Sequence, residues 1–116
     1  MEQVEILVTG RHPQIMDTVL RLINQHGNWN ASGALSDEVA IELFQQRAFR
    51  LVLLCSGISE ESEKKLRALF TFQNPGIIIV QHYGGGSGLL TCEIQEALDK
   101  AAAKNKPVVQ YKDGLL

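Results

Sequence analysis

The apolar residues of the chain fall into short runs, separated by longer segments in which apolar and polar positions follow a helical spacing. The short runs are predicted strands, and they lie at residues 4–8, 29–35, 51–54, 77–80 and 108–111. The runs at 51–54 and 77–80 are apolar throughout, which is typical of strands covered on both faces of a sheet. The run at 29–35 contains a glycine and is weaker, which favours a place at the edge of the sheet.

Four segments between these runs place apolar residues three and four positions apart, on one face of a helix. Pro13 opens the first segment, Ser36 and Asp37 offer a cap for the second, and Ser59 begins the third. The fourth segment ends at Asn105-Lys106-Pro107. The residues expected to face inward include Met16, Val19, Ile23, Ala40, Phe44, Leu66, Phe70, Leu90, Ile94 and Leu98.

Strands that alternate with helices predict an α/β fold with a doubly wound parallel sheet, because parallel strands need right-handed crossovers. The strand order 2-1-3-4-5, as in flavodoxin-like folds, fits best because it leaves the weak second strand and the short fifth strand at the edges. No linker, repeat or low-complexity segment interrupts the pattern, so residues 1–116 are predicted to form one domain.

A functional site in such a sheet lies beyond the carboxyl ends of the strands. Five stretches of the sequence are therefore of interest: residues 9–13, 35–37, 55–58, 81–88 and 111–114. Residues 6–13 (ILVTGRHP) lead into the first helix, and residues 50–55 (RLVLLC) open the second half. These segments resemble the response-regulator receiver family. The resemblance extends over nearly the whole chain.

The resemblance implies an acidic pair at the end of the first strand, which holds Mg²⁺, and an aspartate at the end of the third strand, which accepts phosphate. In this sequence the acidic pair falls on Gly10 and Arg11, and the phosphoacceptor falls on Cys55. An aspartyl phosphate needs a carboxylate nucleophile and a cation held by further carboxylates, and none stands at these positions. The sequence therefore predicts a receiver-like signalling or regulatory module that acts through protein contacts, without phosphorylation, metal, cofactor or enzymatic activity.

The remaining receiver positions also depart from the pattern that the resemblance implies. The Ser or Thr that ends the fourth strand is replaced by His82, and the lysine that ends the fifth strand falls on Tyr111 or Lys112. Two interpretations of Arg11 are open: a solvated side chain at a strand end, or a guanidinium that fills the place of Mg²⁺ and fixes one conformation.

A small-molecule or anion-binding domain is the alternative function. Its site would combine the strand ends with a glycine-rich stretch whose backbone N–H groups precede a helix. That stretch lacks the Gly-Lys-Ser/Thr ending of a P-loop and follows the fourth strand, which favours a flexible loop whose glycines only permit an unusual turn. The residues of the alternative site are Thr9, Gly10, Arg11, Cys55, Ser56, His82, Gly84, Gly85, Gly86, Ser87 and Gly88.

A thiol enzyme or redox sensor is a third hypothesis, because Cys55 and His82 end neighbouring strands and a His lowers the pKa of an adjacent thiol. The competing interpretation is that Cys55 is a small apolar residue in the core. Cys92 is expected to serve packing. Neither cysteine has the spacing of a zinc site or a disulfide framework.

The composition and net charge limit the classes of partner that we expect. The net charge is -2 and the pI is about 5.9, with no run of Lys or Arg, so nucleic acid and membrane surfaces are not expected as direct partners. The chain begins without a signal-like segment, and no apolar run reaches the ~20 residues that span a bilayer. We therefore expect a soluble cytoplasmic protein.

The sequence after the predicted fifth strand leads us to expect a homodimer, because residues 112–116 are too few for the fifth helix of a receiver. That helix shares with the first helix the cover of one sheet face, so half of the apolar residues among 77–80, Val108 and Val109 are predicted to face water. A second copy related by a two-fold axis is the simplest cover, with Leu115 and Leu116 at its border. A different partner protein is the alternative.

Overall fold

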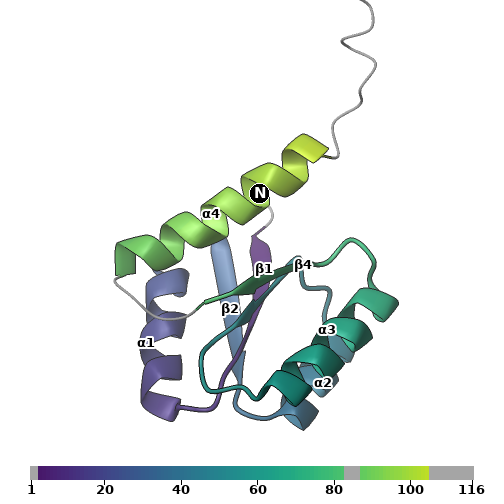
Figure 1. The fold of residues 1–116 in the computed structure, drawn as a ribbon. Helices are drawn as coiled ribbons and strands as arrows, with labels where there is room; N and C mark the ends of the chain where they lie inside the picture. The colour runs from purple at the N-terminus through teal and green to yellow at the C-terminus, as the bar shows by residue number, and fades with distance from the viewer. Residues whose placement is uncertain (1–2, 83–86, 105–116) are drawn as a thin grey trace, which may run out of the picture.

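The computed structural model describes residues 3–82 and 87–104, in which strands and helices alternate (Figure 1). The parallel sheet has the strand order β2-β1-β3-β4. The predicted α/β class, the order of the first four strands and the edge position of β2 are confirmed. The elements are β1 (Val4–Thr9), α1 (Pro13–Asn24), β2 (Trp29–Ala34), α2 (Asp37–Gln46), β3 (Leu51–Leu54), α3 (Glu60–Gln73), β4 (Ile78–Gln81) and α4 (Ser87–Lys104).

The starts of three helices follow from the predicted local signals. Pro13 is the first residue of α1, where its missing N–H costs no helical hydrogen bond. Ser36 Oγ accepts a hydrogen bond from the Val39 N–H at 3.2 Å, and Ser59 Oγ accepts one from the Ser62 N–H at 3.1 Å. Each serine satisfies a backbone donor that the first turn of its helix leaves free.

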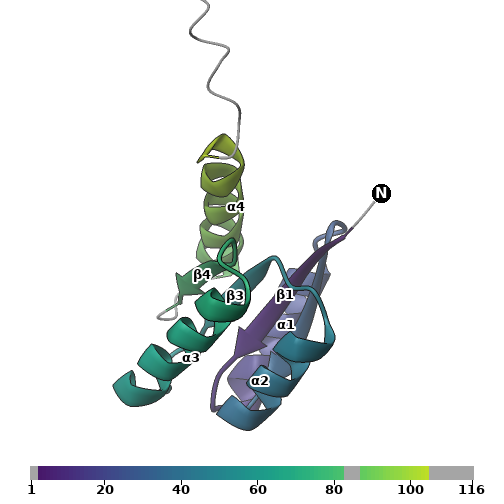
Figure 2. The same ribbon diagram turned by 90° about the vertical axis from the view of Figure 1, so that its right-hand side faces the viewer.

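Two hydrophobic cores cover the two faces of the sheet, because successive side chains of a strand point to opposite faces. α1 and α4 lie on one side, and α2 and α3 lie on the other (Figures 1 and 2). Ile6 and Val8 of β1 belong to the α1–α4 core, whereas Leu7 belongs to the α2–α3 core. All four residues of β3 are buried, as predicted for a strand covered on both faces.

The position of α4 corrects the expectation that one face of β4 would lack a cover. Leu90, Ile94 and Leu98 of α4 are buried in the α1–α4 core, against which Ile78 and Val80 of β4 pack. α4 thus covers part of the strip that was expected to lack a helix, and all four residues of β4 remain half-buried. The homodimer argued from a fully uncovered strip stays a prediction.

β4 is the outermost strand of the described sheet, and the strand predicted to lie beyond it is the fifth. The predicted fifth strand, residues 108–111, lies outside the described residues, as do Leu115 and Leu116. The described part of the chain contains four helices and no fifth.

Candidate functional site

The carboxyl ends of β1, β3 and β4 bring together the three positions that the receiver resemblance singled out. Cys55 donates its N–H to the Thr9 carbonyl at 2.9 Å, and His82 donates its N–H to the Leu54 carbonyl at 2.8 Å. Gly10 lies beside Cys55, because a Cβ placed on Gly10 would be 3.3 Å from the Cys55 Cβ. Gly10, Cys55 and His82 therefore form one rim, as the order of the strands requires.

Arg11 turns along this rim toward the start of α2. Its Nη2 lies 2.5 Å from Asp37 Oδ1, and its Nη1 donates to the Gly10 carbonyl at 3.0 Å and to the Leu35 carbonyl at 3.5 Å. The side chain is thus partly exposed, and its guanidinium binds Asp37 and not Cys55. It fixes the end of β1 to the junction between β2 and α2.

Asp37 is the centre of a cluster that joins β1, α2 and α3, which we call the Asp37 cluster (Asp37, Arg11, Ser62 and Lys65). Its Oδ2 accepts hydrogen bonds from Ser62 Oγ at 2.8 Å and from Lys65 Nζ at 3.0 Å. Burial alone would raise the pKa of Asp37, but the bonds from Ser62, Lys65 and Arg11 and the charge of Arg11 outweigh it. They lower the pKa of Asp37 from 3.8 to about 2, so at neutral pH the carboxylate is charged and bound to these three side chains.

Cys55 stands where the resemblance places the phosphoacceptor, and it is buried, with 4% of its surface exposed. Burial raises the pKa of the Cys55 thiol to about 11. At neutral pH the sulfur therefore carries its proton and is a poor nucleophile. This environment favours the packing interpretation of Cys55 over a thiol enzyme or a redox sensor.

His82 is also buried, and its ring is held by α4. The Nδ1 atom lies 2.7 Å from Glu93 Oε1, which is about the length of a charge-assisted hydrogen bond. The pair links the end of β4 to α4, which lies on the same side of the sheet as α1. His82 therefore has a structural partner in Glu93. It has no thiolate to stabilise, because Cys55 keeps its proton at neutral pH.

The other predicted site residues are more scattered. Thr9 is fully buried and its Oγ1 has no hydrogen-bond partner among the described residues, whereas Ser56 is exposed. Ser87 and Gly88 begin α4. The remaining predicted positions lie outside the described residues: Gly84, Gly85, Gly86, Tyr111 and Lys112.

The hollow at the rim is too small to hold a ligand. Its walls include Gly10, Arg11, Cys55 and Ser56, and the space between them does not admit a water molecule. A phosphate group or a hydrated cation is larger still. In residues 3–82 and 87–104 no group of three or more His, Cys, Asp or Glu side chains is placed to hold a metal ion.

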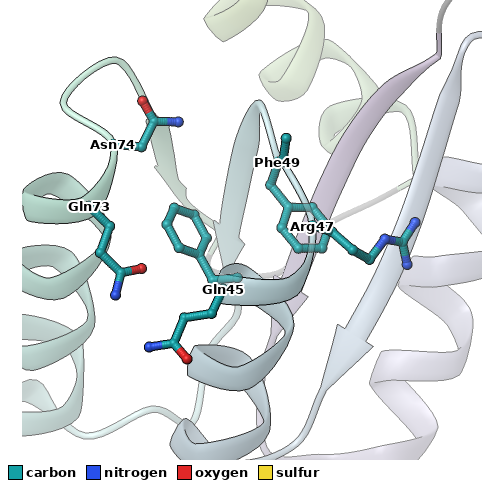
Figure 3. Close-up of a pocket in the computed structure, with 7 residues that line it drawn as sticks. Gln45, Arg47, Phe49, Gln73 and Asn74 are labelled. Atoms are coloured by element: carbon teal, nitrogen blue, oxygen red, sulfur yellow. The ribbon is translucent and has the colours of Figure 1, made fainter.

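A larger hollow, of about 330 Å³, lies at the opposite edge of the sheet, between the carboxyl ends of α2 and α3 (Figure 3). The Arg47 side chain in its wall points away from Gln73 and Asn74 (Figure 3). Arg47 is instead engaged with Glu5 Oε1 at 2.7 Å and Ser32 Oγ at 2.9 Å. The polar group best suited to hold an anion there is thus already used by the fold.

Sequence reasoning missed the partners of the predicted site residues. Asp37 was noted as a possible helix cap and within the stretch 35–37 at the edge of the sheet, but not as a partner of Arg11, and Lys65 and Glu93 were not noted at all. Ser36-Asp37 directly after a strand was the one available signal, because it places a carboxylate at the functional edge of the sheet. Lys65 and Glu93 carry no such signal, since polar residues on an amphipathic helix are expected at its solvent face.

No protein-family model matches the chain, and no curated protein matches its sequence. Solved structures match its fold. The signal receiver domain of an HD domain-containing protein from Pseudomonas fluorescens Pf-5 has a TM-score of 0.77 at 14% identity, over 88% of this chain and 99% of that chain. A CheY-like response regulator receiver domain from Methanospirillum hungatei JF-1 has a TM-score of 0.68 at 15% identity, over 90% and 100%.

A chain from the complex of the histidine kinase ThkA with the response regulator TrrA has a TM-score of 0.65 at 18% identity, over 85% of this chain and 98% of that chain. The first two likenesses cover whole receiver domains. The chain therefore has the receiver fold, as the sequence resemblance implied. In the part of the chain that the structure describes, no helix is both long and apolar enough to cross a membrane.

Proposed function

We propose that the chain is a single receiver-like domain that serves signalling or regulation through protein contacts and does not accept phosphate. The observation that carries this proposal is the chemistry of the rim. Gly10, Arg11 and Cys55 stand where a receiver needs carboxylates, and the nearby carboxylate of Asp37 is held by Arg11, Ser62 and Lys65. A carboxylate with three donors is not available to bind Mg²⁺ or to attack a phosphoryl group.

The Asp37 cluster supports one fixed conformation. A receiver changes its contacts when phosphate and a cation rearrange the carboxyl edge, whereas here a permanent guanidinium already links that edge to α2 and, through Asp37, to α3. Such a domain presents the same surface under all conditions. Its regulation would then come from its abundance or its partner.

A protein partner is supported by apolar side chains around the Asp37 cluster. Ile15 in the first turn of α1, Leu35 between β2 and α2, and Val39 in α2 are all exposed. Each comes from a segment that carries or adjoins the cluster. Apolar side chains rimmed by charged groups are typical of protein-binding surfaces.

We expect the domain to act in the cytoplasm, where Cys55 and Cys92 would remain unpaired, as they are in this structure. Nucleic acid is not an expected direct partner, since the net charge is -2. Self-association is one form that the protein contact can take.

Incubation with acetyl phosphate and Mg²⁺ tests the proposal. We expect the intact mass to stay unchanged, because the chain offers no carboxylate at the acceptor position. A receiver with its aspartate, treated in parallel, controls for the activity of the phosphodonor. A stable gain of one phosphoryl group on this chain at neutral pH would overturn the proposal.

A further inference from the structure

The outer edge of β4 presents free backbone groups among the described residues. Ile78 and His82 donate their N–H groups toward β3, to the carbonyls of Arg50 and Leu54 at 3.2 and 2.8 Å. Successive residues of a strand point their N–H groups to opposite sides, so those of Ile79 and Gln81 point away from β3. In residues 3–82 and 87–104 no strand pairs with that side.

A groove runs along the same edge. It has a volume of about 800 Å³ and is lined by residues 75–80 and, from α4, by Ala97, Lys100, Ala101 and Ala103. We call it the β4 groove. The alanines leave room beside the strand, and the carboxyl-terminal part of α4 extends beyond the sheet (Figure 2). A partner strand or helix can therefore approach the β4 edge closely.

The edge also lacks the usual protection against pairing. Soluble proteins place Lys, Pro, inward charges or a bulge on an exposed edge strand. The sequence of β4 is Ile78-Ile79-Val80-Gln81, with no charge and no proline, and its pairing with β3 is regular over all four residues. β4 is thus suited to accept another strand.

The position of α4 argues against a fifth parallel strand from the same chain. α3 connects β3 to β4 on the α2–α3 side, and this crossover moves toward the outer edge. A right-handed crossover in the same direction needs its helix on that same side, and α4 is on the other. A strand from residues 105–116 added there would make a left-handed connection, whereas about 98% of such connections are right-handed.

We infer that the outer edge of β4 binds β4 of a second copy of this chain, in antiparallel pairing about a two-fold axis, with the β4 groove receiving the partner copy. A two-fold axis makes the surface self-complementary, and residues 77–81 then offer Ile79 and Gln81 backbone groups to one another. The four described strands of each copy would then join in one continuous sheet. This inference rests on the proposed role in protein contact but not on the absence of phosphorylation.

Sedimentation of the full chain tests the inference. At ~50 μM the protein is expected to sediment as a dimer, about twice the monomer mass of 12.8 kDa. Ile79→Pro removes the outward N–H without touching the bonds to β3, and should weaken the dimer at least about tenfold. Ile79→Ala is the matched control: it loses the same side chain, keeps the N–H and should retain the dimer.

A second variant keeps the test decisive if Ile79→Pro fails to fold. Ala101→Glu places a charge in the β4 groove without altering β4 and should also dissociate the dimer, whereas Val39→Lys on α2 should not. A monomeric full chain, or a dimer unaffected by Ile79→Pro and Ala101→Glu, would overturn the inference. If the chain is a monomer, hydrogen exchange identifies what covers the edge. Faster exchange at Ile79 and Gln81 in Val109→Lys would show that the chain's own end covers it, which would also overturn the inference.

A gain of one phosphoryl group in the acetyl phosphate experiment would overturn the proposed function and leave the dimer inference standing. A monomer in the sedimentation experiment would overturn the dimer inference and leave the proposed function standing.

Discussion

Cys55→Asp is expected to destabilise the fold by about 3 kcal/mol or more at neutral pH and to leave the chain unable to accept phosphate. The new carboxylate would lie at a position with 4% exposure, next to Gly10 and without a cation. Arg11, which lines the same hollow as Cys55, is already bound to Asp37. Restoring the acceptor alone therefore adds an unpaired buried charge and no metal site.

Urea unfolding of the variant measures this effect, with Cys55→Ala as the control for the lost side chain. Burial raises the pKa of an unpaired aspartate, so the penalty should shrink as the pH falls and the carboxyl becomes neutral. An aspartate variant within about 1 kcal/mol of the alanine variant at pH 7 would contradict the closed, apolar character of this position. Phosphorylation of the variant would contradict the role given to the missing acidic pair.

Asp37→Asn is expected to cost about 2 kcal/mol at neutral pH. The lowering of the Asp37 pKa from 3.8 to about 2 corresponds to a stabilisation of this size. The amide keeps the shape of the side chain but removes the charge that Arg11 and Lys65 share. Glu38→Gln is the matched control, because Glu38 is the next acidic residue of α2 and is exposed. It should cost less than about 0.5 kcal/mol.

The pH dependence of the Asp37→Asn effect has a definite sign. A carboxyl whose pKa is lower in the folded state than in the unfolded state stabilises the fold above the unfolded value and loses that contribution as the pH falls. The gap between the original chain and Asp37→Asn should therefore be full above pH 4 and close as the pH approaches 2. A gap of unchanged size at pH 2 would assign the effect to packing and not to charge.

Much of the fold followed from local sequence. Alternating strand and helix patterns, Pro13, and the caps at Ser36 and Ser59 each act over a few residues, and the structure confirms them. The face that α4 covers did not follow. The periodicity of Leu90, Ile94 and Leu98 shows that one side of the helix is buried, but either face of a sheet can bury it.

The candidate site divides in the same way. Parallel strands end at one edge, so the sequence was sufficient to expect Gly10, Cys55 and His82 near one another. The Asp37 cluster was not predictable from spacing, because Arg11 and Asp37 are 26 positions apart and Lys65 lies on another helix. The pairing of β1 with β2 brings Arg11 to the start of α2, and the packing of α2 beside α3 brings Lys65 to Asp37.

The most direct test of a fixed, phosphate-independent domain is an NMR titration of the full chain with Mg²⁺ and then with beryllofluoride, which imitates a phosphoryl group on aspartate. We predict that the amide signals of Gly10, Cys55 and His82 keep their positions, because neither ligand finds a free carboxylate or room for itself at the rim. Saturable shifts at these three amides would contradict the account.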